Sequence, residues 1–383
     1  MSTAASLTSD SIGRAEQFST RVAFFIAGFG GAVWAGLVPF AKTRAGLEAG
    51  GLGLLLLSFG IGSIIAMPLA GALAGKYGCR RVLIATSLMV CVALPALATL
   101  SSPMLLAAAL FVLGAGVGSV DCVINIQAVI VERAAGRALM SGFHGLFSVG
   151  GIAGAGGCSV ILSLGGSPVI VSLVAFVFTA AMLAWAAPHF LTYGGDTSGP
   201  AFALPHGVVL FIGILCFIVF LTEGSILDWS AVFLTSTRAA DPAHAGLGYA
   251  AFATTMTIGR LSGDAIVRRV SRTTIILVGG LLAASGLLVA TLVPSVLAAL
   301  VGFALVGAGC SNIVPVLYSA IGKQTLMPES VAVPAITTLG YAGILMGPAA
   351  IGFVAHVASL PTAFLIVSVS LIGVAVSGRF LKA

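Results

Sequence analysis

Long apolar segments follow one another along almost the whole chain, and they constrain the fold more than any other feature. Of its 383 residues, 59% are hydrophobic and only 7% are charged, whereas a soluble domain carries roughly 25% charged residues. A helix needs about 20 mostly apolar residues to cross a bilayer, and its backbone polar groups must be satisfied inside the segment. The sequence therefore predicts an all-α polytopic membrane protein.

Short polar or Gly/Pro breaks divide the apolar sequence into twelve predicted spans, and one longer connection separates six from six. The first residues lack the apolar core and cleavage site of a secretory signal, so the first span is expected to be retained. We expect a cytoplasmic tail (1–19), an N-terminal six-helix bundle (20–188), a cytoplasmic linker (189–206) and a C-terminal six-helix bundle (207–383). The predicted spans are 20–41, 50–74, 81–101, 103–130, 138–164, 167–188, 207–234, 245–267, 273–293, 295–321, 330–355 and 360–381.

The basic residues indicate the orientation. If the N-terminus is cytoplasmic, fourteen Lys and Arg side chains fall on the cytoplasmic side and three on the opposite side. This excess follows the positive-inside rule and predicts that both termini are cytoplasmic. The net charge of +6 is then a consequence of topology, so we expect a lipid bilayer and no nucleic acid as partner.

The two halves contain related segments at a nearly constant spacing. GALAGKYGCR, which begins at Gly71, aligns with GDAIVRRVSR from Gly263 at an offset of 192 residues. Gly114-Ala-Gly aligns with Gly307-Ala-Gly at an offset of 193. Internal repeats of this kind are typical of secondary transporters. They predict two pseudo-symmetric bundles that work by alternating access.

The segment from Gly71 to Arg81 resembles the loop between helices 2 and 3 of the major facilitator superfamily. With the twelve spans, the division into six and six and the charge bias, the resemblance covers the whole chain. The chain departs from the family at Gly75, where an Asp is usual. The charge that latches this loop to its neighbours is therefore weakened, and Asp264 with Arg268 is expected to carry more of that role.

A narrower resemblance rests on helix 4. Asp121 followed by Asn125, after a Gly-rich stretch, is similar to the acidic-then-Asn pattern of fucose-permease-like proton symporters. The segment from Glu223 to Ser230 and the later Gly340-Tyr341 resemble a group of bacterial inner-membrane transporters near those permeases. The resemblance implies proton coupling. Helix 1 departs from it, because it lacks the second coupling carboxylate of fucose permeases.

Asp121 is the first candidate for proton coupling. A charge at membrane depth costs about 3 kcal/mol on insertion scales, so a carboxylate that persists there suggests function. Asp121 and Asn125 are spaced i, i+4 and share a helix face. Because burial favours the neutral form of a carboxyl group, such a residue can load and release a proton. The alternative is a hydrogen bond across a helix interface.

Glu223 is the second candidate. It lies about 16 residues into a predicted span, which is ~24 Å at ~1.5 Å per residue and just beyond the membrane centre. A coupling or substrate-binding role competes there with a helix-packing hydrogen bond. Asp228 and Trp229 fall nearer the outer surface, where an interfacial or outer-gate role competes with substrate contact.

Other polar side chains within the spans are candidates for a substrate cavity or a gate. Amides and hydroxyls among aromatic faces suit a neutral, sugar-like solute, although a single core hydrogen bond is the alternative for each residue. Arg260 and Asp264, again i, i+4, are expected to form a pair. The candidate substrate-binding residues are Asn125, Gln127, Trp34, Asn312, Tyr318, Tyr341, Asp228 and Trp229, and the gating or structural candidates are Lys76, Arg80, Arg260, Asp264, Arg268 and His144.

Several patterns are missing from the sequence. It has no Walker loop and no metal-ligand spacing, and its six cysteines are scattered singly, which argues against ATP-driven transport, a metal or another cofactor. The leading prediction is a monomeric, proton-coupled symporter for a small neutral or weakly polar solute. The alternatives are a proton-driven exporter of drugs or metabolites and a transporter-like sensor or scaffold; an intramembrane enzyme is disfavoured.

Overall fold

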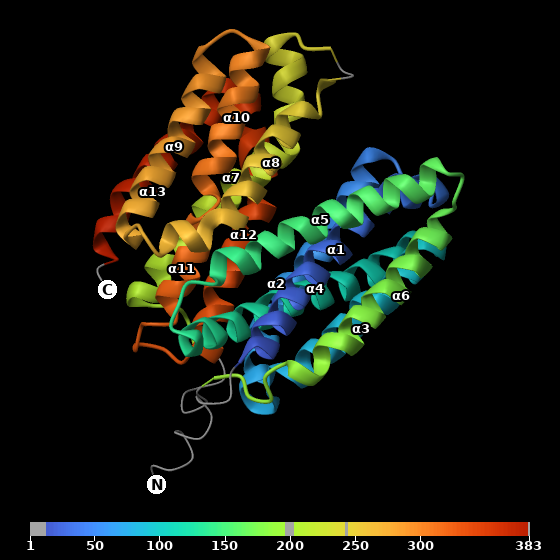
Figure 1. The fold of residues 1–383 in the computed structure, drawn as a ribbon. Helices are drawn as coiled ribbons and strands as arrows, with labels where there is room; N and C mark the ends of the chain where they lie inside the picture. Colours follow the sequence, from blue (N-terminus) through green and yellow to red (C-terminus); the bar gives the residue numbers. More distant parts are fainter. Residues whose placement is uncertain (1–12, 196–202, 242–243, 382–383) are drawn as a thin grey trace. The chain divides into compact units, whose positions relative to one another are not determined.

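The computed structural model describes residues 13–195, 203–241 and 244–381, and within these residues it contains helices and no β-strand (Figure 1). The predicted tail up to residue 12 and the linker residues 196–202 lie outside the described part. The helices are α1 (Arg14–Arg44), α2 (Ala49–Tyr77), α3 (Cys79–Thr99), α4 (Pro103–Ala135), α5 (Met140–Ser163), α6 (Pro168–Ala186), the 3₁₀-helix η2 (Ala187–His189), α7 (Gly207–Arg238), α8 (Leu247–Val267), α9 (Arg272–Leu292), α10 (Val296–Cys310), α11 (Ile313–Ile321), α12 (Glu329–Val357), α13 (Leu360–Ser377) and the 3₁₀-helix η4 (Gly378–Phe380).

The predicted all-helical membrane fold is confirmed. Eleven helical segments in the described ranges are long and apolar enough to cross a membrane, and α8 supplies the twelfth predicted span. α8 is less apolar because it carries Arg260 and Asp264. The predicted span 295–321 differs in detail, since the helix is interrupted at Ser311 and Asn312 and so forms α10 and α11.

Local capping explains why several helices begin where they do. Four serines precede a helix and accept a hydrogen bond from the backbone N–H three residues later, which satisfies one of the donors left unpaired at every helix start. Proline occupies the first helical turn of α4, α6 and α13, where its missing N–H costs nothing. The capping serines are Ser167, Ser271, Ser295 and Ser359.

The chain divides into two compact units. Unit 1 comprises residues 1–136, 146–204 and 327–334, and unit 2 comprises residues 137–145, 205–326 and 335–383. The first turns of α5 thus group with unit 2, and the first turns of α12 group with unit 1. Each of these helices contributes to both units.

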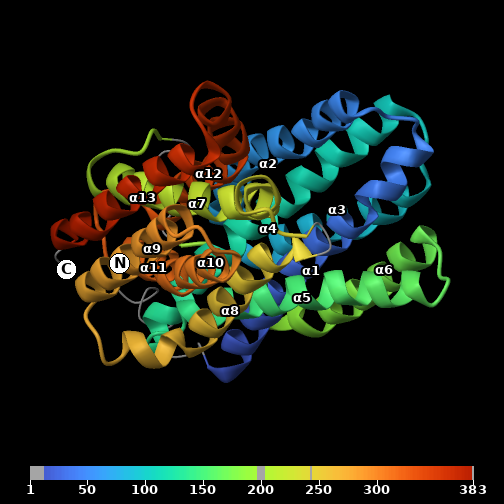
Figure 2. The ribbon, with the colours of Figure 1, turned by 90° about the horizontal axis from the view of Figure 1, so that it is seen from above.

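Glycines allow close helix packing inside unit 1. α2 runs along α4 (Figures 1 and 2), and the α carbon of Gly114 lies against the backbone of Phe59. In the same way Gly150 of α5 lies against the carbonyl of Phe25 in α1. A Cβ at either glycine would overlap backbone atoms, so these contacts need the small residue.

Unit 2 uses the same kind of contact. In α9 and α10, Gly286 and Gly302 approach each other's backbone, and Gly343 of α12 lies against the carbonyl of Phe217 in α7. Lipid tails are as apolar as the side chains of the helices, so the hydrophobic effect does not drive these helices together. Close backbone packing drives their association instead. The polar side chains of the spans are held on this framework.

Candidate functional site

The polar pair of α4 lies in unit 1. The amide nitrogen Nδ2 of Asn125 donates to the backbone oxygen of Asp121 at 2.8 Å and lies 3.5 Å from its carboxylate Oδ1. Asn125 is buried, whereas Asp121 is partly exposed. The amide oxygen of Asn125 has no hydrogen-bond partner among the described residues. A buried acceptor without a partner is costly, so it is a point where a donor of a bound solute could be accommodated.

Both polar ends of the Gln127 side chain are hydrogen-bonded to other parts of unit 1. Its Nε2 donates to the Thr20 hydroxyl at 2.9 Å, and its Oε1 accepts from the backbone N–H of Leu191 at 3.1 Å. The side chain is fully buried. Both ends of the amide therefore join α4 to α1 and to the segment after η2, which favours the packing alternative for this residue.

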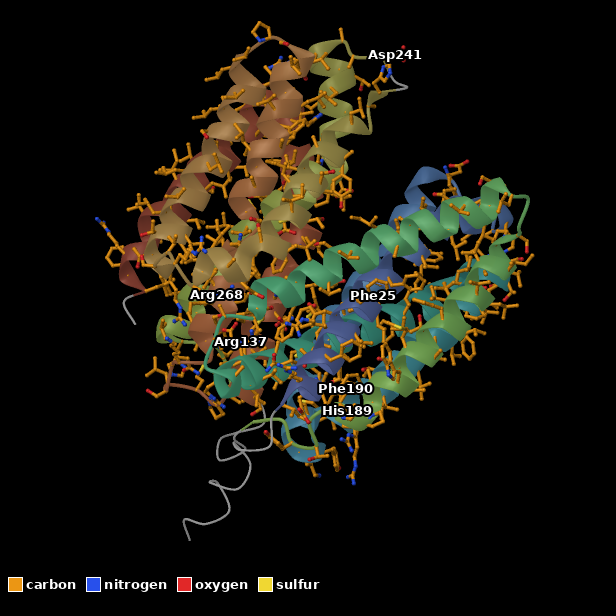
Figure 3. The ribbon with its side chains drawn as sticks, viewed as in Figure 1. Phe25, Arg137, His189, Phe190, Asp241 and Arg268 are labelled. Atoms are coloured by element: carbon orange, nitrogen blue, oxygen red, sulfur yellow. The ribbon has the colours of Figure 1, made fainter. Side chains whose placement is uncertain are left out.

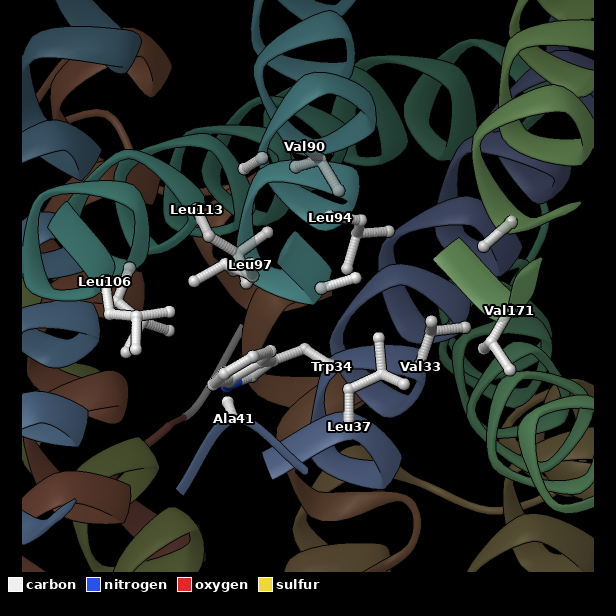
Figure 4. Close-up of a cluster of buried hydrophobic side chains, with 14 of the residues drawn as sticks. Val33, Trp34, Leu37, Ala41, Val90, Leu94, Leu97, Leu106, Leu113 and Val171 are labelled. Atoms are coloured by element: carbon white, nitrogen blue, oxygen red, sulfur yellow. The ribbon is translucent and has the colours of Figure 1, made fainter. Parts of the chain in front are cut away.

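Trp34 lies in an apolar core cluster of unit 1. Its neighbours in that cluster include Leu37, Leu94 and Leu97 (Figure 4), and only 5% of the residue is exposed. These surroundings are aliphatic, so the indole ring fills the core between α1 and α3. A packing role is favoured over solute contact here too.

The charged residues of unit 2 form an ion pair between α7 and α8. Arg260 Nη2 donates to Glu223 Oε1 at 3.1 Å, and the side chains are only 7% and 14% exposed. Asp264, the predicted partner of Arg260, accepts the backbone N–H of Gly142 with its Oδ1 at 3.1 Å. Gly142 lies in the first turn of α5, where N–H groups lack helical acceptors and favour a carboxylate.

We did not predict the Glu223–Arg260 pair from the sequence, although the opposite charges in two neighbouring spans indicate it. Arg260 is the one basic residue well inside a predicted span, and Glu223 is an acid deep in the preceding span. A charge at membrane depth is expected to pair with another charge. Charge balance between neighbouring spans could therefore have found the pair.

Asn312 occupies the interruption between α10 and α11. Its Nδ2 donates to the backbone oxygen of Gly259 at 2.9 Å and to the Ser311 hydroxyl at 3.0 Å. Its Oδ1 has no hydrogen-bond partner within the described ranges and lies against Gly263, where a Cβ would overlap it. Two glycines of α8 thus lie next to this amide, one as its hydrogen-bond acceptor and one in close contact with its oxygen.

His144 and Tyr318 lie close together in unit 2. Their ring centroids are 5.7 Å apart. His144 Nδ1 lies 3.0 Å from the backbone oxygen of Met140, and the Tyr318 hydroxyl lies 2.8 Å from that of Thr337. Both rings are buried. A ring contact thus joins α5 to α11, and a contact between hydroxyl groups joins α11 to α12.

The remaining candidates lie nearer the helix surfaces. Trp229 Nε1 donates to the backbone oxygen of Pro348 at 3.2 Å and so ties α7 to α12, while Asp228 is exposed and Tyr341 is half-buried. Lys76 lies in the last turn of α2 and is exposed. Arg268, which directly follows α8, is exposed too (Figure 3). Arg80 is half-buried and bonds the backbone after α6.

Comparison with known proteins establishes the family. The family model of the Major Facilitator Superfamily matches residues 20–325. The chain belongs to the major facilitator superfamily. It is 54% identical over 368 residues to an uncharacterised MFS-type transporter of Yersinia pestis, with 96% of each chain covered. It is 32% identical over 356 residues to an uncharacterised transporter of Sinorhizobium fredii, covering 91% of this chain and 93% of the relative.

Solved structures agree in fold. A crystal structure of the E. coli fucose:proton symporter FucP superposes with a TM-score of 0.77 at 17% identity, covering 96% of this chain and 98% of FucP. At that identity the likeness concerns the fold alone. Its membership of the superfamily and its transporter relatives make this chain a membrane transporter for a small-molecule substrate and not an enzyme.

Proposed function

We propose that this superfamily member is a proton-coupled symporter for a small, net-neutral polar solute, and that it acts as a monomer by alternating access. The proposed location is a bacterial inner membrane with both termini in the cytoplasm, as the positive-inside bias favours. Asp121 is the proposed proton-coupling residue. Asn125 is the proposed polar contact for the solute.

The observation that carries the proposal is the arrangement of Asp121 and Asn125 in α4. A carboxyl group stands beside an amide whose oxygen is buried without a partner in the described structure. Protonation of Asp121 removes a charge from an apolar helix and converts an acceptor into a donor. Proton binding therefore changes what hydrogen bonds this helix face can offer to a solute.

The ion pair of unit 2 supports a net-neutral solute. The charge of Arg260, the one cation well inside a predicted span, is balanced by Glu223 at 3.1 Å. A permanently anionic solute would have to compete with Glu223 for this guanidinium. Protonation of Glu223 would weaken that balance, so we assign Glu223 the role of a second coupling residue that acts through Arg260.

The relatives are consistent with this proposal. FucP, which shares the fold, is a fucose:proton symporter, and the Asp121–Asn125 pattern resembles helix 4 of fucose-permease-like proteins. Substrates do not follow from fold. The solute class must therefore come from experiment.

Flux through proteoliposomes tests the function. Purified protein would be reconstituted, and uptake of labelled sugars and polyols measured with an inward proton gradient, with no gradient and with an outward gradient. Accumulation only with the inward gradient is the expected result. Solute efflux driven by proton entry would replace the symporter by an exporter, and binding without flux would indicate a sensor.

Asp121→Asn tests the coupling residue, with Asp241→Asn as the matched control because Asp241 is exposed (Figure 3). We expect Asp121→Asn to abolish accumulation while solute exchange without a gradient persists. The control should accumulate as the wild type does. Normal gradient-driven accumulation by Asp121→Asn would remove Asp121 from the mechanism.

A further inference from the structure

Two arginines end the first helix of each half and bind the end of another helix. Arg44 is the last residue of α1, and Arg238 is the last residue of α7. Each guanidinium donates to two backbone carbonyls, at the end of α3 for Arg44 and at the end of α9 for Arg238. Both arginines are half-buried. Each of them therefore links two helix ends within its own unit.

Arg44 supplies donors to the end of α3. Its Nε donates to Leu100 O at 2.9 Å, and its Nη2 donates to Leu97 O at 2.6 Å. α3 ends at Thr99, and the carbonyls of a last helical turn have no N–H partner further along the helix. Leu97 and Ala41 of α1 belong to one apolar cluster (Figure 4). The guanidinium thus satisfies carbonyls that this apolar packing cannot satisfy.

Arg238 does the same for α9. Its Nη2 donates to Ala290 O at 2.6 Å and to Thr291 O at 2.7 Å. In a continuing helix Ala290 O would accept the N–H of residue 294, but Pro294 has none. The guanidinium also lies over the buried ring of Phe233, 4.9 Å from its centroid, which is a favourable cation–π arrangement. Hydrogen bonds and the ring together fix the position of this side chain.

The two contacts follow the internal repeat. Arg238 lies 194 residues after Arg44, and Ala290 lies 193 residues after Leu97. The aligned sequence segments of the two halves are offset by 192 and 193 residues, so the arginines and their acceptors occupy equivalent places. A chance surface contact would not be expected at the same place in both halves. The repetition indicates that the fold requires it.

The turn after α7 indicates that this helix end is held in place. Ala239 has φ +53°, a left-handed conformation that is strained for a residue with a Cβ. After α1 the left-handed position falls on Gly46, at φ +62°, where it causes no such strain. A strained residue persists where the surrounding contacts fix the backbone. The hydrogen bonds of Arg238 are contacts of this kind.

We propose that Arg44 and Arg238 are two equivalent clamps, one in each unit, that keep the end of α1 joined to α3 and the end of α7 joined to α9 while the transporter changes conformation. The proposal accounts for an exception in the charge pattern. Arg44, Arg238 and Lys42 are the three basic residues that lie opposite the predicted cytoplasmic side. Two of the three are present there because helix ends near an apolar phase need donors.

Hydrogen–deuterium exchange of the purified, solute-free protein tests the clamps one at a time. Leu100 and Val293 directly follow α3 and α9, and each N–H donates to a carbonyl of its helix, so the two amides report fraying. We expect Arg44→Ala to raise exchange at Leu100 by about tenfold or more, the factor for one charge-assisted hydrogen bond, and to leave Val293 unchanged. Arg238→Ala should have the reverse effect. Lys42→Ala, which removes a charge from the same turn of α1, should change neither amide.

A lysine variant and thermal unfolding separate the clamp from its charge. Lysine lacks the planar fork of arginine, so Arg44→Lys should give exchange at Leu100 between that of the wild type and that of Arg44→Ala. Each alanine variant should lower Tm by about 2–4 °C. Because the clamps lie in different units, the double variant should lose the sum of the two shifts.

Four results would overturn the proposal. Fast exchange at Leu100 or Val293 in the wild type would mean that the helix ends separate. Unchanged exchange at both amides in the alanine variants would mean that the arginines hold nothing. A rise throughout the protein would replace a local clamp by general damage to the fold. An equal effect of Lys42→Ala would assign the protection to charge alone. All of these readouts are independent of the solute and of proton coupling.

Discussion

The ion pair between Glu223 and Arg260 yields a quantitative prediction for a double-mutant cycle. At 3.1 Å, two unit charges in an effective dielectric constant of about 20 attract by ~5 kcal/mol. Much of this attraction only offsets the desolvation of the two buried side chains. Removing one partner of a buried pair costs about 3–5 kcal/mol, whereas replacing both is often neutral.

We therefore expect Glu223→Gln and Arg260→Gln each to destabilise the protein by about 3–5 kcal/mol, and the double variant to lie near the wild type. With an unfolding entropy of about 2.1 cal/mol/K per residue, each single change corresponds to a fall in Tm of about 5 °C. Thermal unfolding in detergent ranks the stability of the wild type, the two single variants and the double variant. The coupling energy follows from the cycle.

Arg269→Gln is the control for loss of an arginine, because Arg269 is exposed and should shift stability by less than about 0.5 kcal/mol. Single variants that both melt like the wild type would refute the proposed pairing, and so would a double variant that is less stable than either single one. Additive losses would mean that the two charges stabilise the fold separately and not as a pair.

Three further changes test the packing roles assigned above. Gln127→Leu leaves the buried Leu191 N–H without its acceptor, so we expect a loss of about 1–3 kcal/mol, measured by thermal unfolding. Gly114→Val should push α2 from α4 at Phe59 and lower the yield of folded protein on gel filtration by more than Gly157→Val does. Trp34→Ala should cost about 3–5 kcal/mol of stability but leave solute affinity unchanged in the surviving folded protein, and an altered affinity would return Trp34 to the solute site.

Much of the fold could be predicted because lipid imposes local rules. Each span must be apolar over about 20 residues and must satisfy its own backbone, so the sequence marks spans without reference to the rest of the chain. Serine and proline at the breaks mark helix starts for equally local reasons. The interruption at Asn312 was not predicted, because the Gly259 carbonyl that holds the amide comes from another helix.

The side-chain partners depended on the tertiary structure. The sequence alone identified Asp121, Glu223 and Arg260 as costly polar residues in apolar helices. It did not identify the pairing of Arg260 with Glu223, because that choice depends on how α7 and α8 are rotated and packed.

The segment 187–195 after α6 shows the same division. Its sequence is that of a connection, and only the folded chain brings its carbonyls to the uncapped start of α3, more than 100 residues earlier. Apolarity and capping act between near neighbours and can be read along the chain. Hydrogen bonds and ion pairs between helices depend on the packing that close glycine contacts allow, and that packing exists only in the tertiary structure.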